Sequence, residues 1–180
     1  DLDGNLIDEP DAPMHKAGFV IHSAIHGGRE DVDCVIHTHS KAGVAIAAMK
    51  DGLLPLSQHA QLFYGRVSYH DYEGLAVDID ERARLIRDLG DNPVMILRNH
   101  GTLAVGKNVG ECFIRLYYIE RACQAQIMAL SAGDRINTPP QGSPEITAQQ
   151  GAVGLPMAAN FLAWPALKRK AYRMDPSFAT

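Results

Sequence analysis

Residues 33–40 read DCVIHTHS, and this stretch decides the fold expected for the chain. Its first five residues are mostly β-branched or apolar, which predicts a short buried strand over 33–37. Ser40 is a favourable N-cap residue, so a helix is expected over 41–49, closed by the turn at Asp51-Gly52. A strand that runs into a helix is the unit from which layered α/β proteins are built.

Strands and helices alternate on both sides of this stretch. Further helices are expected over 14–27, 80–89 and 109–131, and further strands over 66–69, 94–97 and 101–106. Asp80 is expected to cap its helix. The bend at His100-Gly101 is too tight for the crossover that joins parallel strands. The sequence therefore predicts an α/β fold, a three-layer α/β/α sandwich with a mixed, largely antiparallel central sheet.

The composition changes from Asp134 onward. Residues 138–144, TPPQGSP, are linker-like, and a last helix is expected around 160–173. The length suits a single domain over 1–180, with 134–180 as a C-terminal extension that ends in this helix. The chain opens on Asp1 without an initiator methionine, and an additional N-terminal part is expected.

Charge, hydropathy and cysteine content limit the classes of partner. The formal net charge is −4, and the longest basic run, Lys168-Arg169-Lys170, is interpreted as a solvated helix face, so no nucleic-acid partner is expected. No stretch approaches the roughly 18 apolar residues of a membrane span, and no membrane partner is expected. Cys34, Cys112 and Cys123 are an odd number without close pairing, which predicts buried free thiols and a cytoplasmic location.

Three histidines are predicted to form one metal site. His37 and His39 stand two residues apart at the end of a strand, so their side chains project from the same face, roughly 6.5–7 Å apart along the strand. Both rings can tilt toward one ion at about 2.0–2.1 Å. His100 ends another strand, and Gly101 is expected to let the backbone turn sharply beside it. Three neutral imidazoles leave a fourth position open, as in catalytic metal sites.

The remaining histidines and one carboxylate have other interpretations. His22 and His26, at i and i+4, are interpreted as packing or surface residues, and His15 and His70 as solvated residues in a loop or at a helix start. His59 lies in an irregular region and could reach a site. Glu120 falls on the apolar stripe of the helix over 109–131 and is expected to be satisfied by an Arg or a backbone donor.

At these residues the chain resembles the class II aldolase and adducin head-domain family. The resemblance extends from about residue 14 to 132 and is carried by Ile21-His22, Arg29-Glu30-Asp31-Val32, Val35-Ile36-His37-Thr38-His39-Ser40, Tyr72-Glu73-Gly74, Leu97-Arg98-Asn99-His100-Gly101 and Ile119-Glu120-Arg121-Ala122. It implies an α/β/α sandwich, a four-fold homotetramer with sites at subunit interfaces, and zinc bound by His37, His39 and His100. In such aldolases the ion polarises a carbonyl and hydroxyl pair and stabilises an enediolate.

The sequence departs from the aldolase pattern at Gly18. The aldolases carry a proton-handling carboxylate four residues before the position of His22. With glycine there, this chain resembles the aldolase-like and adducin-like branch that lacks the usual catalytic Glu. Glu9 and Asp11 lie upstream, and the phosphate-binding loops of those aldolases precede this region. Another group must then move protons, and the candidates are His59, Tyr64, Tyr69 and Tyr72. The sequence does not rank these four, although His59 is named as the catalytic candidate because the intrinsic pKa of an imidazole is the most suitable near neutral pH.

The function predicted from these observations is a metal-dependent lyase. It would act on a small hydroxy- or oxo-carbonyl compound by retro-aldol cleavage or decarboxylation, with no organic cofactor. Zinc suits imidazole ligands best, and Mn, Co, Ni or Fe would also fit. The alternatives are a non-catalytic adducin-like oligomerisation module and a metal-dependent sugar-phosphate epimerase.

Overall fold

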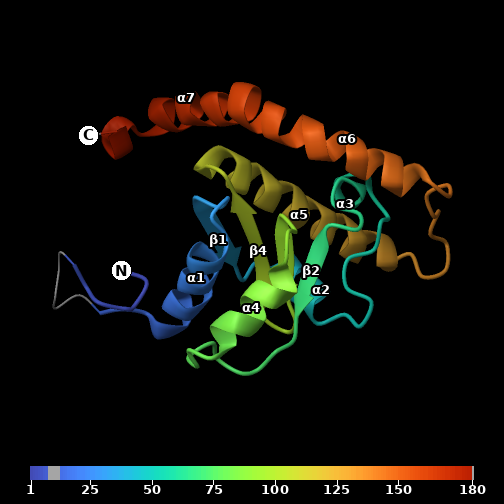
Figure 1. Cartoon of the computed structure of the whole chain (residues 1–180). Coiled ribbons are helices and arrows are strands. Elements are labelled where there is room, and N and C mark those ends of the chain that lie inside the picture. The colour runs from blue at the N-terminus through green and yellow to red at the C-terminus, as the bar shows by residue number, and fades with distance from the viewer. Residues whose placement is uncertain (8–12, 180) are drawn as a thin grey trace.

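A four-stranded mixed sheet forms the centre of the molecule (Figure 1). The computed structural model describes residues 1–7 and 13–179. The strands are β1 (Cys34–Thr38), β2 (Val67–His70), β3 (Val94–Leu97) and β4 (Gly101–Gly106), arranged in the order β1-β4-β3-β2. β4 is antiparallel to both of its neighbours, whereas β2 and β3 are parallel. This arrangement confirms the predicted mixed, largely antiparallel sheet.

Helices cover both faces of the sheet and give it three layers. On one face, α1 (Lys16–Gly28) and α4 (Glu81–Leu89) enclose an apolar core that includes the buried side chains of Ile25, Leu85 and Leu103. On the other face, α2 (Lys41–Ala47) and α5 (Val109–Leu130) enclose a second core, together with the short α3 (Gln58–Gln61). The two cores follow from the alternation of inward-facing side chains along each strand. The predicted α/β/α sandwich is thus confirmed.

Local capping explains where several of these helices begin. The Ser40 hydroxyl caps α2 as predicted, accepting a hydrogen bond from the Gly43 N–H at 3.0 Å. Asp80 precedes α4, but its side chain makes no capping hydrogen bond, so the prediction for Asp80 was wrong. The Asp78 carboxylate instead accepts a hydrogen bond from the Asp80 N–H at 3.1 Å, which holds the loop ahead of the helix.

The C-terminal residues form a long helical arm, residues 143–179, that lies along α5 and continues past the N-terminal end of α5 (Figure 1). It comprises α6 (Ser143–Met157), the π-helical η1 (Ala158–Ala163), α7 (Trp164–Met174) and the 3-10 turn η2 (Pro176–Ala179). The end of the predicted linker, residues 138–144, therefore belongs to α6, a helix that was not predicted from the sequence. Gly151 explains the close packing of α6, because a Cβ there would lie 2.9 Å from Leu62 Cδ2 and 3.0 Å from Leu62 O.

Two further expectations concern the thiols and the membrane. All three cysteines are free thiols; Cys112 and Cys123 are buried, and Cys34 is half-buried on β1. Among the helices in the described part of the chain, none combines the length and the apolar character that crossing a bilayer requires.

Candidate metal centre

Strand pairing brings His37, His39 and His100 to one edge of the sheet. β1 pairs with β4 so that His37 lies opposite Leu103 and Thr38 lies opposite Thr102. The connection from β3 to β4 carries His100 directly before β4 begins, so His100 lies beside the end of β1. Asn99 has a φ of 55° in this connection and supplies the left-handed backbone that the turn requires.

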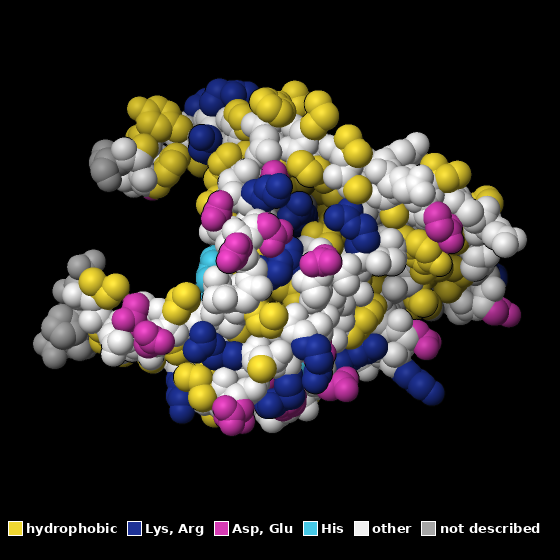
Figure 2. Space-filling model, in the orientation of Figure 1, with side chains coloured by type: hydrophobic (Ala, Val, Ile, Leu, Met, Phe, Trp, Pro, Cys, Tyr) yellow, Lys and Arg dark blue, Asp and Glu magenta, His cyan; other side chains and the backbone are white. Residues whose placement is uncertain are grey.

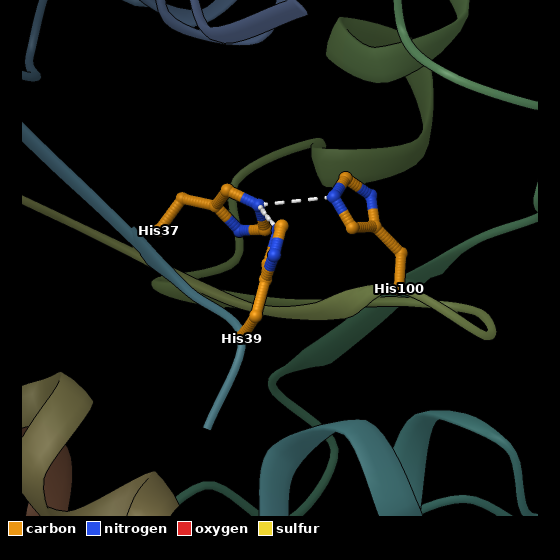
Figure 3. Close-up of side chains that lie close together, drawn as sticks. All are labelled: His37, His39 and His100. Atoms are coloured by element: carbon orange, nitrogen blue, oxygen red, sulfur yellow. Dashed lines mark hydrogen bonds between the residues drawn. The ribbon is translucent and has the colours of Figure 1, made fainter. Parts of the chain in front are cut away.

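The three imidazoles converge on a single point (Figure 3). The Nε2 atom of His37 lies 2.8 Å from that of His39 and 3.2 Å from that of His100. The three rings are packed edge to face, with centroids 4.6–4.7 Å apart. Tetrahedral zinc with bonds of about 2.0–2.1 Å needs nitrogens roughly 3.3 Å apart, so small ring rotations suffice for all three to coordinate one ion.

The surroundings favour the neutral, metal-binding form of these rings. The Nδ1 atom of His37 lies 3.0 Å from the Thr102 carbonyl oxygen, which can only accept a hydrogen bond. The proton therefore sits on Nδ1 and the lone pair on Nε2 faces the other rings. Burial, with His100 and His39, lowers the pKa of His37 to about 4 against the opposing effect of the Thr102 carbonyl. Burial, then His39 and His70, also lowers the pKa of His100.

Gly101 is required at the site by space rather than by its backbone conformation. A Cβ at Gly101 would lie 2.4 Å from the Thr38 carbonyl oxygen, 3.1 Å from His39 Cδ2 and 3.3 Å from His37 Cε1. The positive φ of the turn belongs to Asn99, so the predicted reason for this glycine was wrong. Any side chain at residue 101 would displace β1 and two of the three rings.

Ser40 and Glu120 support the site from the opposite face of the sheet. The Ser40 hydroxyl donates a short hydrogen bond to Glu120, and the Gln124 side-chain amide donates a second one at 3.0 Å. Glu120 is therefore satisfied as expected, but by a hydroxyl and an amide instead of an Arg or a backbone donor. Because Ser40 follows His39 directly, this contact ties the end of β1 to α5.

A buried charged cluster lies beside His100. His70, 4% exposed at the end of β2, places Nδ1 2.7 Å from Asp88 and Nε2 3.3 Å from Glu81. The interpretation of His70 as a solvated residue was therefore wrong. A cavity of about 10 Å³, enough for one water molecule, is lined by His70, Glu81, Tyr72 and His100. The Tyr72 ring lies 6.5 Å from the His100 ring.

The other proton-transfer candidates lie in different surroundings. His59 is on α3, where its ring lies 5.3 Å from the Tyr118 ring. The Tyr69 hydroxyl accepts a hydrogen bond from Leu53 N–H at 3.0 Å, and Tyr64 is exposed. Glu9 and Asp11 lie outside the described residues. Of these candidates, only Tyr72 has a described ring contact with a histidine of the triad.

Two groups at the site were not predicted from the sequence. The Thr102 carbonyl belongs to the backbone and carries no residue-type signal, since any residue at that register would present it. His22, on α1, was interpreted as a packing or surface residue; it is half-buried and is one of the groups that lower the pKa of His37. Its own pKa is lowered by burial and then by His26.

Comparison with known proteins places the chain in a family. The profile of the Class II Aldolase and Adducin N-terminal domain matches residues 1–127. The chain belongs to this family. The resemblance predicted from the motifs is therefore confirmed, and the three histidines lie within the matched residues.

Relatives of this class II aldolase and adducin domain include proteins with different names. A Caulobacter vibrioides protein, provisionally named an aldolase class 2 protein, is 45% identical over 180 residues, 99% of this chain and 70% of the relative. Alpha-adducin of Rattus norvegicus is 42% identical over 134 residues, covering 73% of this chain and 18% of alpha-adducin.

Solved structures of the class II aldolase family share the fold. An aldolase II superfamily protein from Pseudomonas syringae aligns with a TM-score of 0.87 at 44% identity, covering 97% of this chain and 70% of that one. The L-fuculose 1-phosphate aldolase from Glaciozyma antarctica aligns with a TM-score of 0.66 at 28% identity, over 76% of this chain and 51% of that one. Class II aldolases generally bind a divalent metal ion, and the triad could hold one here.

Proposed function

We propose that this chain binds one divalent metal ion through the Nε2 atoms of His37, His39 and His100 and acts as a metal-dependent lyase. The observation that carries the proposal is the convergence of these three nitrogens, with the tautomer of His37 fixed by the Thr102 carbonyl. The donor set fits zinc first, since imidazole is a preferred zinc ligand, and Mn, Co, Ni or Fe after it.

The proposed substrate is a small hydroxy- or oxo-carbonyl compound that undergoes retro-aldol cleavage or decarboxylation. A bound ion would supply a Lewis acid that polarises a carbonyl oxygen. The aldolase names among the relatives support carbon–carbon bond cleavage as the type of reaction. Gly18 offers no acid or base on α1, one helical turn before His22, so the proton must move through another residue of this chain.

We assign the proton transfer to the Tyr72 phenol. Its ring lies edge to face with the His100 ring, with centroids 6.5 Å apart, and it is half-exposed, so a substrate at the centre could reach it. A phenol can donate and then recover a proton. The role of His59 stays a prediction, because its described ring contact is with Tyr118 on the α5 side of the sheet.

Two other functions remain alternatives, an adducin-like module without catalysis and a sugar-phosphate epimerase. The likeness to alpha-adducin supports the first. Against it stands the triad, because a purely structural module has no physical need for three imidazoles whose lone pairs meet at one point. A homotetramer, by family resemblance, and a cytoplasmic location, from the free thiols, complete the proposal.

Metal analysis of wild-type protein and two histidine variants tests the metal site. His39→Ala removes one proposed ligand, and His26→Ala is the matched control because His26 is exposed at the end of α1. We expect one ion per chain in wild type and His26→Ala, and loss of the ion from His39→Ala with an unchanged circular-dichroism spectrum. Wild-type metal content in His39→Ala would refute the site, and its global unfolding would make the site structural.

A substrate screen then tests the lyase assignment. Metal-loaded protein would be assayed against small oxo-acids, hydroxy-acids and sugar phosphates. We expect cleavage or decarboxylation in wild type, with kcat reduced in Tyr72→Phe at unchanged metal content. Epimerisation without cleavage would favour the epimerase, and an unchanged kcat in Tyr72→Phe would remove Tyr72 from the mechanism.

A further inference from the structure

The edge of the sheet opposite the metal centre holds a second cavity, of about 130 Å³. It lies where β2 and β3 begin and where β4 ends, at Gly106. Five steps of about 3.4 Å along β4 separate this edge from Gly101 at the histidine end, roughly 17 Å in all. The cavity has room for several water molecules, and therefore for a small anion, and it shares no lining residue with the histidine site.

The lining of this cavity is rich in cations. Its charged residues are four basic and two acidic side chains: Arg29, Arg66, Lys107, Arg115, Asp31 and Asp91. Four positive charges minus two negative ones give the lining a formal charge of +2, in a chain whose net charge is −4. Figure 2 shows basic and acidic side chains gathered beneath the C-terminal arm. Cations are thus concentrated here against the overall charge of the chain, which favours an anion as the ligand.

Two of the four cations are held in place by the protein itself. The Arg29 guanidinium donates hydrogen bonds to both carboxylate oxygens of Asp31, at 2.7 and 2.8 Å. The Arg115 guanidinium donates to the Val105 carbonyl oxygen at 2.6 Å and to the Glu111 carboxylate at 3.3 Å. A guanidinium has five N–H donors, so these bonds orient both groups and leave donors over.

The other two cations lack such partners. Within the described residues, neither the Arg66 side chain nor that of Lys107 makes a hydrogen bond or an ion pair. Arg66 is half-buried directly before β2, so it has lost part of its hydration without gaining a protein acceptor. Lys107 is exposed and adds to the effect of the Arg29 hydrogen bonds, which hold the pKa of Asp31 at about 2. Two cations with unused donors therefore line one cavity.

The cations of this cavity also act on one another. Burial lowers the pKa of Arg115 against the opposing effect of Glu111, and Arg66 and Arg29 lower it further. Guanidinium groups stay protonated in proteins, so this crowding is a repulsion that the folded chain carries. A bound anion would offset the repulsion and accept hydrogen bonds from the unused donors.

We propose that this cavity binds the phosphoryl group of a small anion, either inorganic phosphate or a phosphate monoester. Guanidinium groups match phosphate oxygens through paired N–H donors, and a lysine adds a point charge. Arg66 and Lys107 would contact the phosphoryl oxygens, while Arg29 and Arg115 form the fixed positive wall. α5 begins at Val109, so the positive end of its dipole lies at the same edge of the sheet. The site is separate from the histidines and does not depend on the proposed metal chemistry.

Isothermal titration calorimetry of the full chain with inorganic phosphate and with glycerol phosphate tests the site. The protein is first stripped of metal with a chelator and dialysed, so that phosphate cannot bind to an ion at the histidines. Chloride and acetate at matched ionic strength are the comparison anions. We expect one site per chain, at least about tenfold tighter for phosphate or its monoester than for acetate, and the tighter probe identifies the source of the phosphoryl group. At ten times its Kd, that probe should raise Tm by about 3–6 °C.

Substitution of the two unpartnered cations locates the binding. Arg66→Gln should weaken binding of the tighter probe at least about tenfold, because it removes charged donors to the phosphoryl oxygens. Lys107→Gln should weaken it about two- to fivefold, as expected for an exposed ion pair. Arg82→Gln is the matched control, because Arg82 is half-buried on α4 and outside the cavity lining, and its loss changes the net charge equally. It should leave the Kd within a factor of two of wild type.

Three results would each overturn the proposal. The first is phosphate and glycerol phosphate binding no tighter than chloride or acetate. The second is an unchanged Kd in Arg66→Gln, and the third is an equal loss in Arg66→Gln and Arg82→Gln, which would show that only net charge matters. Thermal melts verify folding of each variant. If Arg66→Gln does not fold, Arg66→Lys, which keeps the charge without the paired donors, and Lys107→Gln decide the question by the same measurement.

Discussion

Replacing Gly101 by Ala tests whether close contact between β1 and β4 sets the geometry of the metal centre. The added Cβ would lie 2.4 Å from the Thr38 carbonyl oxygen, whereas unstrained heavy-atom contacts are about 3.5 Å or more. The strands must therefore separate by roughly 1 Å at this point. The same Cβ would press on His39 Cδ2 at 3.1 Å and on His37 Cε1 at 3.3 Å.

The strain from this overlap should appear both in stability and in metal affinity. Inserting a methyl group into tight packing costs about 1–3 kcal/mol. For a protein of this length, each kcal/mol corresponds to a fall in Tm of about 2–4 °C. Zinc affinity should fall about 10- to 100-fold, as when the support of a ligand ring is lost. Urea denaturation of metal-free protein and zinc titration against a competing chelator measure the two effects.

Gly154→Ala is the matched control for this substitution. Gly154 lies on α6, and a Cβ there would meet nothing within 4 Å. Ala should stabilise the helix by about 0.5–1 kcal/mol and leave zinc affinity unchanged. If Gly101→Ala kept wild-type stability and bound zinc within a factor of two of wild type, the steric account of this glycine would be refuted.

Two further predictions concern titration and the buried charged cluster. The pKa of His37 is about 4 in the folded protein and 6.5 ordinarily, so between these pH values the unfolded chain binds more protons than the folded chain. The contribution of His37 to the free energy of unfolding of the metal-free protein should therefore be fully present above about pH 6.5 and be lost as the pH falls toward 4. Urea denaturation midpoints measured across this pH range give the slope of stability against pH. The slope should be shallower in His37→Gln than in wild type, and equal slopes would show that His37 is not the group responsible. Asp88→Asn removes a charged partner of the buried His70 and should lower the free energy of unfolding by about 1–3 kcal/mol at pH 7. The control Asp91→Asn, at an exposed residue, should change it by less than about 0.5 kcal/mol. Equal urea midpoints for these two variants would show that the cluster contributes nothing to the fold.

The layers of the fold and the meeting of the three histidines could be predicted because their signals are local. A strand ending in His37 and His39 and another ending before His100 show residue types at fixed spacing, and short connections limit the ways in which they can pair. The β3–β4 connection left the antiparallel arrangement as the natural solution. Family motifs carried the same information along most of the chain.

The parts that were missed depend on packing that residue types do not encode. The buried residues of α6 include Ala148 and Gly151, too small to give the apolar periodicity of a helix, and Pro144 reads as a linker residue although it suits a first helical turn. His70 looks like a surface histidine until α4 supplies Glu81 and Asp88 from a distant segment. Gly101 has its role because another strand passes within contact distance, which no local pattern reveals.

β1 forms one border of the sheet, and in the described part of the chain it is paired with β4 alone. An edge strand of this kind is hydrogen-bonded on one side only, and it opens locally at a lower free energy than the central strands of the sheet. The positions of His37 and His39 therefore depend on the local opening equilibrium of β1. The metal centre could lose its geometry while the global melting curve stays unchanged. Native-state hydrogen exchange at the amides of β1 would detect such opening. Exchange protection of these amides is therefore a better measure of whether the metal centre is intact than Tm.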